Sequence, residues 1–207
     1  NDNVAPEGDN SGILGKARYM APEVVTGKAM PSKQTDRYSL SVVLFLLFYA
    51  NHPLEGARVL ACPCMTEKFE KKFYGEEPIF IYDQKNSDNR PVRGVHNNVL
   101  RRWNAFPALL RETFLQEFSE ECLKNPSKRK IERNWQSIIQ KLRDSLVVCP
   151  ECGEETFVED STAPSCMNCG KKFTLPGILK IGDRNVLFTP KTKVYIDMDN
   201  KPDIQVV

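Results

Sequence analysis

The feature that most constrains the fold is a pair of short cysteine motifs in the last third of the chain. Each motif has the pattern Cys-x-x-Cys-Gly, and thirteen residues separate the first motif's second cysteine from the second motif's first. Two residues between cysteines let one tight turn present both thiolates to a metal ion, and the glycine relieves the backbone after the turn. The spacing predicts a zinc ribbon at residues 149–175 with one four-thiolate site. Its ligands are Cys149, Cys152, Cys166 and Cys169.

Four cysteine ligands leave no open position on a tetrahedral zinc ion. We therefore expect the zinc to be structural and not to activate water. The alternative is that these cysteines are free or disulfide-linked. Seven cysteines, four of them in matching pairs, favour metal ligands in a reducing compartment, so we expect a cytoplasmic protein. Cys62 and Cys64 have no further Cys or His cluster nearby in the sequence and are interpreted as loop thiols.

The charge of the chain excludes few functions by itself. With 29 Lys and Arg against 27 Asp and Glu, the formal net charge is +2, too small to argue for nucleic acid or a membrane. Acidic residues outnumber Lys171 and Lys172 in the predicted ribbon, so we do not expect it to bind nucleic acid. The longest apolar run, residues 42–50, has about half of the ~20 residues that cross a bilayer. We therefore expect no membrane partner.

Residues 1–148 are predicted to be mainly helical. One helix is expected to begin after Ser32, with Thr35 or Asp36 as its N-cap. Other apolar residues fill most of the rest of its surface, so we expect this helix to be buried on all sides. Its main apolar face comprises Leu40, Val43, Leu44, Leu47 and Phe48.

Two later stripes of apolar residues predict further amphipathic helices. Between these helices and the first one, the run at residues 79–82 is typical of a short strand. The first stripe comprises Leu110, Phe114, Phe118 and Cys122. The second comprises Ile131, Trp135, Ile138, Leu142 and Leu146.

Beyond Cys149 the sequence changes to short strand-like pieces separated by turn residues such as those at 182–185. We therefore expect an α+β fold in three parts. These are a helical domain at 1–148, the ribbon at 149–175 and a small β extension at 176–207. The strand-like pieces lie at residues 156–158, 173–175, 178–181, 186–189, 193–196 and 204–207.

Three short motifs follow one another in the helical part. Residues 15–23 read Gly-Lys-Ala-Arg-Tyr-Met-Ala-Pro-Glu, residues 35–40 read Thr-Asp-Arg-Tyr-Ser-Leu, and residues 125–129 read Asn-Pro-Ser-Lys-Arg. Together they resemble Ser/Thr protein kinases from the end of the activation segment to the last helix of the C-terminal lobe. With a long insert at residues 62–98, the ribbon and the β tail, the chain is similar to bacterial kinases associated with tellurite-resistance and stress operons.

The resemblance implies roles for individual residues. Glu23 is expected to pair with Arg129 in a largely buried ion pair that locks the lobe. Asp36 is expected to accept hydrogen bonds from the backbone of the family's catalytic loop. Both roles are structural, so neither residue would perform chemistry itself.

The substrate-facing loop of the family falls at Lys16, Arg18 and Tyr19. Lys16 stands where the family usually has a threonine whose hydroxyl contacts the catalytic aspartate, so substrate recognition or activity is open to question. Ser11 is the only hydroxyl residue before Tyr19. It is a candidate phosphosite, because a phosphate there would pair with nearby cations. The alternative is an ordinary solvated loop serine.

Phosphoryl transfer needs a glycine-rich phosphate cover, a lysine, a base in a His-Arg-Asp loop, and metal ligands from Asn and Asp. None of these motifs occurs in the 207 residues, so no catalytic residue is assigned. We expect a full-length ATP- and Mg-dependent Ser/Thr protein kinase of which this chain alone is inactive. The alternative is a pseudokinase or zinc-ribbon scaffold that recruits a protein. In either case the partner is a protein substrate or a signalling protein.

Overall fold

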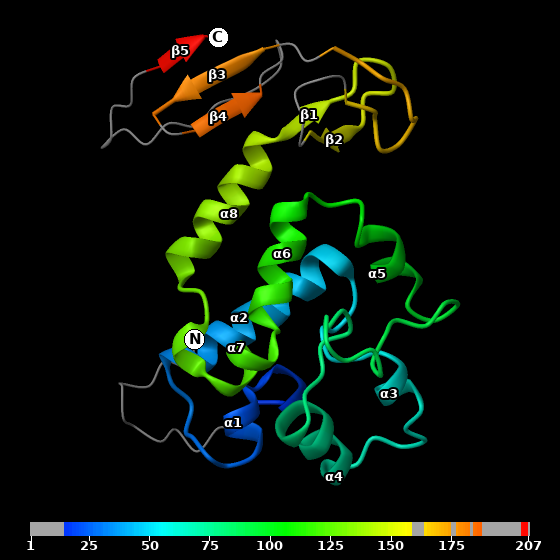
Figure 1. Ribbon diagram of the computed structural model, residues 1–207, viewed down its shortest axis with the longest axis vertical. Helices are drawn as coiled ribbons and strands as arrows, with labels where there is room; N and C mark the ends of the chain where they lie inside the picture. The colour runs from blue at the N-terminus through cyan, green and yellow to red at the C-terminus, as the bar shows by residue number, and fades with distance from the viewer. Residues whose placement is uncertain (1–14, 159–163, 175–176, 183, 188–203, 207) are drawn as a thin grey trace. The chain divides into compact units, whose positions relative to one another are not determined.

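A computed structural model describes most of the chain as two compact units (Figure 1). The first unit is Asn1–Asn104 with Arg111–Glu132, and the second is Ala105–Leu110 with Arg133–Val207. The predicted α+β class is confirmed, whereas the three predicted domain boundaries stay predictions. Among the described residues, no helix has both the length and the apolar character needed to cross a bilayer. The described residues are 15–158, 164–174, 177–182, 184–187 and 204–206.

Short helices surround one long helix, α2, in the first unit. The predicted strand at residues 79–82 is wrong, because this segment has no strand partner and is held by loop contacts instead. The α-helices are α1 (Pro22–Val25), α2 (Lys33–Tyr49), α3 (Ala57–Leu60), α4 (Glu67–Glu70), α5 (Asn97–Arg102), α6 (Ala108–Glu117, which begins in the second unit) and α7 (Glu120–Lys124). The other helical turns are η1 (Ala17–Tyr19), the π-helix η2 (Lys71–Glu76) and η3 (Pro126–Lys128).

Helix α2 begins with a capping box. The Ser32 hydroxyl accepts from the Thr35 amide at 3.5 Å, and the Thr35 hydroxyl accepts from the Ser32 amide at 2.8 Å. The predicted N-cap at Thr35 or Asp36 is therefore wrong by one helical turn. Thr35 contributes from inside the helix, where its side chain completes the reciprocal pair.

The buried face of α2 differs from the predicted one. Val43 is 52% exposed and Leu47 is 69% exposed, so the prediction of a helix buried on all sides is wrong. The buried stripe contains Tyr38, Phe45 and Tyr49. Aromatic rings bury more apolar area than Leu or Val, which explains why this stripe faces the core.

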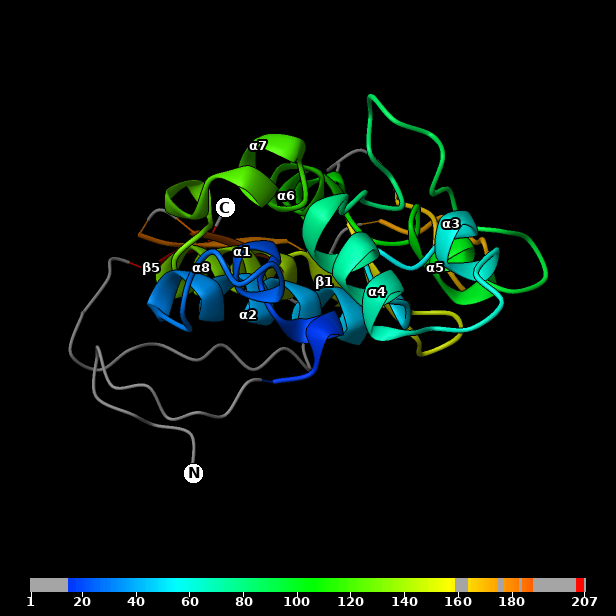
Figure 2. The same ribbon diagram turned by 90° about the horizontal axis from the view of Figure 1, so that it is seen from below.

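Phe45 lies at the centre of the first unit's core. Its ring centroid is 5.5 Å from that of Phe80, 5.0 Å from Phe114 and 5.9 Å from Phe118. In Figure 2, α6 and α7 lie across from α2. The burial predicted for Phe114, Phe118 and Cys122 is confirmed. Phe114 lies in α6, Phe118 in the turn after it and Cys122 in α7, which starts where the Ser119 hydroxyl accepts from the Cys122 amide at 3.3 Å.

Asn89 fastens the 62–98 insert to the loop after α2. Its side-chain oxygen accepts from the amides of Gly56 and Arg58, each at 3.2 Å. Its side-chain nitrogen donates to the carbonyls of Leu54 at 2.8 Å and Ile79 at 2.7 Å. A Cβ at Gly56 would lie 2.0 Å from the Asn89 carbonyl oxygen, so only glycine fits there. Asn89 therefore satisfies four backbone groups in the interior.

We predict that Asn89→Ala lowers the free energy of unfolding by about 3 kcal/mol, because it strands buried backbone donors and acceptors. The matched control is Asn98→Ala, since Asn98 is an exposed residue of α5. We expect the control to change stability by less than about 0.5 kcal/mol. Urea denaturation followed by tryptophan fluorescence checks both variants. Equal losses in the two variants would contradict the role given to Asn89.

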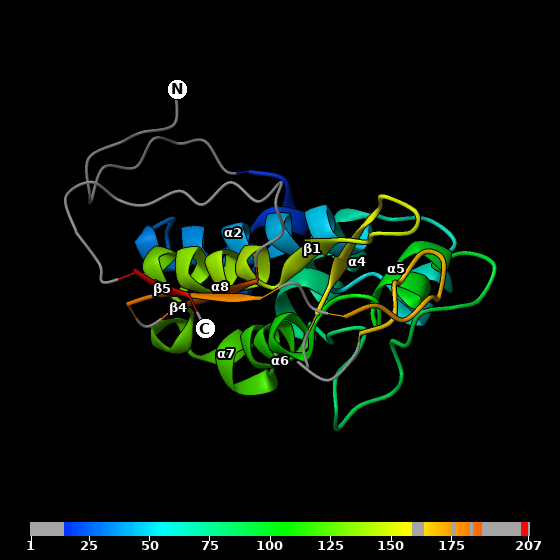
Figure 3. The ribbon, with the colours of Figure 1, turned by 90° about the horizontal axis from the view of Figure 1, so that it is seen from above.

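The second unit contains α8 (Glu132–Asp144) from Arg133 onward and two small antiparallel sheets. In Figure 3, α8 leads into β1, which pairs with β2. In the other sheet β3 lies between β4 and β5. The predicted turn at 182–185 is too long, because Arg184 already pairs with Ile181 in the ladder. The strands are β1 (Leu146–Val148), β2 (Glu155–Phe157), β3 (Ile178–Ile181), β4 (Arg184–Leu187) and β5 (Ile204–Val206).

A buried carboxylate joins α8 to β4 within the second unit. Arg184 donates to Asp144 through Nε at 2.8 Å and through Nη2 at 2.7 Å. Gln140 donates to the same carboxylate at 2.9 Å. This two-pronged geometry fixes the end of α8 against the second sheet. The pieces predicted at 188–189 and 193–196 lie outside the described residues.

Candidate functional site

The two Cys-x-x-Cys-Gly motifs fold into the same tight turn. In each motif the glycine amide donates to the carbonyl of the first cysteine, Gly153 to Cys149 at 3.0 Å and Gly170 to Cys166 at 2.9 Å. The glycine φ angles are 75° and 71°, in the left-handed region that glycine adopts without strain. The sequence therefore forms one turn twice, and each turn presents two thiols.

The four thiols converge on one point. All four sulfur atoms lie within 4.8 Å of one another, and Cys149 Sγ is 3.9 Å from Cys169 Sγ while Cys152 Sγ is 3.6 Å from Cys166 Sγ. Zinc–sulfur bonds of about 2.3 Å in a tetrahedron place sulfurs about 3.8 Å apart, whereas a disulfide needs about 2.05 Å. The four cysteines thus fit one metal ion, and none is in a disulfide.

The second turn is supported by backbone hydrogen bonds. The amides of Cys169 and Asn168 donate to Cys166 Sγ at 3.5 and 3.4 Å and, together with the neighbouring thiols, hold the pKa of that thiol below its usual value. A thiolate is the form that ligates metal. The fully buried Thr156 of β2 accepts from the Met167 amide at 3.1 Å. Strand β2 therefore anchors the turn.

The structure places Glu23 against Arg129, as the resemblance implies. Arg129 donates from Nη1 to Glu23 Oε1 at 2.7 Å and from Nη2 to Oε2 at 2.8 Å. Their side chains are 1% and 16% exposed, with Arg129 the lower. Arg129 Nη1 also donates to the Gln34 carbonyl at 3.1 Å, and its guanidinium lies 5.4 Å from the centre of the Tyr38 ring. The pair thus joins α1 to the start of α2 and to the segment after η3.

The residues assigned to the substrate-facing loop have different surroundings. The Ser39 hydroxyl donates to the Tyr19 carbonyl at 2.8 Å, and Arg18 forms an ion pair with Glu55 at 2.9 Å. Lys16 is exposed immediately before η1. Arg18 and Tyr19 are therefore tied to α2 and the loop after it, while Lys16 faces solvent.

A buried histidine beside this loop was not identified as a site residue from the sequence. His52 accepts from the Leu54 amide at Nδ1 (3.2 Å), so its proton lies on Nε2, which donates to the Arg18 carbonyl at 2.6 Å. Burial lowers the pKa of His52 to about 4, and the ring is neutral at neutral pH. The Tyr74 hydroxyl donates to Glu55 at 2.7 Å. In the sequence, only the His-Pro pair that follows α2 pointed to a special role for this histidine.

The other residues predicted from the sequence lie neither in the four-cysteine cluster nor at the Glu23–Arg129 ion pair. Asp36 is exposed in the first turn of α2 and has no hydrogen-bond partner for its carboxylate among the described residues, so its role stays a prediction. Ser11 lies outside the described residues. Cys62 donates to the Cys64 carbonyl at 3.2 Å in a loop, as predicted, and Cys122 is buried in the core.

Comparisons with protein-family models, with curated proteins and with solved structures found no match for this chain. The resemblance to kinases therefore stays a prediction from the three sequence motifs.

We predict that Arg129→Met costs about 3–5 kcal/mol of stability, because it leaves the Glu23 carboxylate largely buried without its partner. The double variant Glu23→Leu/Arg129→Met should recover part of this loss, since neither charge is then stranded. Lys128→Met is the matched control, because Lys128 is an exposed neighbour paired with Glu121. We expect it to cost less than about 1 kcal/mol.

Urea denaturation of the wild type, Glu23→Leu, Arg129→Met, the double variant and Lys128→Met measures these differences. A double variant that loses as much as the sum of its single variants would contradict the coupling of Glu23 and Arg129.

Proposed function

We propose that the second unit binds one structural zinc ion through Cys149, Cys152, Cys166 and Cys169. The sulfur separations and the duplicated turn support this proposal. Four soft thiolates in tetrahedral positions suit zinc, and a closed four-ligand set leaves no position for substrate. The bound ion would cross-link the two turns. Its contribution is to folding, since small metal domains draw their folding free energy from the metal.

We predict one zinc ion per chain when the protein is purified without chelator. Cys166→Ser should lose the metal, because a neutral hydroxyl is a poor replacement for a thiolate ligand. Cys62→Ser is the matched control, since Cys62 lies in a different loop, and it should keep the metal. Elemental analysis by mass spectrometry measures zinc in each protein. Wild-type protein without metal and with all four thiols titratable would refute the site.

We further propose that the first unit is the C-terminal part of a protein Ser/Thr kinase lobe. The observation that carries this proposal is the Glu23–Arg129 ion pair, which joins residues 106 positions apart. It brings the first and third motifs together against the start of α2, where the second motif lies. Chance occurrences of three short motifs would not require such a contact.

In this proposal the chain holds the substrate-facing loop and does not transfer phosphate. Ser39 and His52 fix the Tyr19 and Arg18 carbonyls, so the backbone of this loop has a set position for a protein substrate. ATP, Mg²⁺ and the catalytic aspartate of phosphoryl transfer would be bound or supplied by the remainder of a longer protein.

The second candidate is a pseudokinase or zinc-ribbon scaffold that recruits a protein partner. Lys16 favours it, because an exposed lysine stands where the family usually has a threonine that contacts the catalytic aspartate. A scaffold needs only the fold and a binding surface.

The gene distinguishes the two candidates. For a kinase, the reading frame ahead of Asn1 should encode a phosphate-binding lysine, a catalytic-loop aspartate and a metal-binding aspartate. The longer protein should transfer phosphate from radiolabelled Mg-ATP to itself or to a generic Ser/Thr substrate, and residues 1–207 alone should transfer none. If the frame lacks these residues, or if the longer protein incorporates no phosphate, the kinase proposal fails and the scaffold remains.

A further inference from the structure

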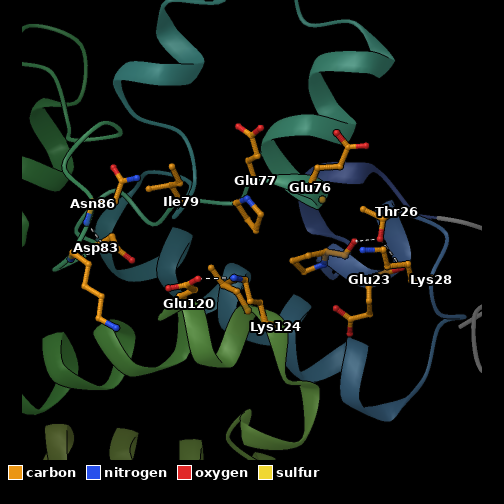
Figure 4. A pocket seen from close by; sticks show the side chains of 15 residues that line it. Glu23, Thr26, Lys28, Glu76, Glu77, Ile79, Asp83, Asn86, Glu120 and Lys124 are labelled. Carbon is orange, nitrogen blue, oxygen red and sulfur yellow. Dashed lines mark hydrogen bonds and ion pairs between the residues drawn. The ribbon is translucent and has the colours of Figure 1, made fainter.

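The cleft of about 520 Å³ in the first unit has a lining of mixed charge (Figure 4). Five carboxylates and three lysines surround it. Several of them pair with one another or with neighbouring residues, as Glu120 does with Lys124 and Glu77 with Arg58. The lining therefore selects a ligand of neither charge.

The seven cysteines of the chain fall into three groups with different chemistry. Four converge in the ribbon, and Cys122 is buried in the core, where burial raises the pKa of its thiol. The other two, Cys62 and Cys64, lie in the loop between α3 and α4, where Cys64 is exposed and Cys62 is half-buried. They belong neither to the core nor to the metal cluster. These two thiols therefore remain available for chemistry of their own.

Both thiols belong to one turn. The chain bends at Pro63 and Cys64, and the Cys62 thiol donates to the Cys64 carbonyl at 3.2 Å. Cα atoms two residues apart are at most about 7 Å from each other, and a bend shortens that distance. A disulfide needs a Cα separation of roughly 4.4–6.8 Å. A bond between these two neighbours is therefore within reach of the turn.

Cys62 is held in place, whereas the backbone at Cys64 can adjust. The Cys62 amide donates to the Val59 carbonyl at 3.1 Å, which ties it to the end of α3. In the part of the chain that the structure describes, the amides of Cys64 and Met65 donate to no acceptor. Asn89 fastens the base of the same segment. Closing a ring at Cys64 would thus leave α3 and the core in position.

We propose that Cys62 and Cys64 form a reversible disulfide by exchange with a low-molecular-weight disulfide such as oxidised glutathione. The thiolate of the exposed Cys64 attacks one sulfur of the small disulfide, which releases one small thiol and leaves a mixed disulfide on Cys64. The Cys62 thiolate then attacks the Cys64 sulfur and releases the second small thiol. The two cysteine protons end on the released thiols, so the chain is oxidised by two electrons and the small disulfide is reduced.

Ring closure is favoured over reaction with a second small disulfide. The attacking thiol is only two residues away, so its effective concentration at the mixed disulfide is high. In a reducing compartment such a bond would be transient, which is the behaviour of redox-sensing thiols. The proposal depends neither on zinc nor on phosphoryl transfer.

The test treats the protein, purified without chelator, with oxidised glutathione, blocks the remaining thiols and digests it with trypsin. Trypsin cuts after Lys and Arg, so it releases residues 59–68 with Cys62 and Cys64 and no other cysteine. Mass spectrometry should find this peptide lighter by two hydrogens, with neither thiol blocked and no glutathione attached. Excess reduced glutathione should restore both thiols. The ribbon cysteines lie in other peptides, so the result does not depend on the metal.

Single variants separate the two steps. Cys62→Ser should stop at the mixed disulfide with one glutathione on Cys64, whereas Cys64→Ser should leave the half-buried Cys62 as a thiol. Both positions lie in a loop, so both variants should fold, and circular dichroism checks this. The matched control is Met65→Ala, which changes an exposed neighbour of the turn and should form the disulfide as wild type does. The peptide at residues 112–124 should stay reduced, because its one thiol, Cys122, is buried.

The proposal is overturned if the wild-type peptide at residues 59–68 keeps both thiols or accumulates glutathione in place of the internal bond. It is equally overturned if reduced glutathione does not reopen the bond. Uptake of glutathione by Cys64→Ser as fast as by Cys62→Ser would also overturn it, because Cys64 would then not be the attacking thiol.

Discussion

The arrangement of the first unit depends on the ion pair between Arg129 and Glu23. Removing two charges from water is costly, and their attraction offsets that cost only when the geometry is good and further hydrogen bonds are made. Here two parallel bonds, the Gln34 carbonyl and the face of Tyr38 provide that environment. Since the pair is stable only in this setting, it fixes α1 and α2 in position despite the sequence distance between the partners.

The second unit has a different source of order. Its strands β1 and β2 are three residues each, and such short strands are only marginally stable in isolation. A metal ion held by the convergent thiols would reduce the need for a large core, because it would replace many apolar contacts as a cross-link. The Asp144–Arg184 pair then connects this region to the second sheet. The chain thus combines a unit ordered by its aromatic core with a unit whose order would depend on metal.

Features that depend on residues close together in the sequence were predicted better than features that depend on distant residues. The cysteine spacing was sufficient for the thiol cluster, because both members of each pair lie in one turn. The buried face of α2 was misjudged, since counting apolar positions weights Leu47 equally with Phe45, whereas packing favours the ring. Asn89 gave no signal, because its four partners are scattered along the chain and have no period.

The Asn89 contact has a consequence for how this chain can vary. It closes the segment from Gly56 to Asn89 at its base, 33 residues apart. Once a loop is closed, extra residues within it add only a slowly growing entropic cost. The exposed stretch at residues 63–66 is therefore a place where length and sequence can change or a new segment can be inserted. The backbone around Ile79 would keep its position, because Asn89 also donates to the Ile79 carbonyl.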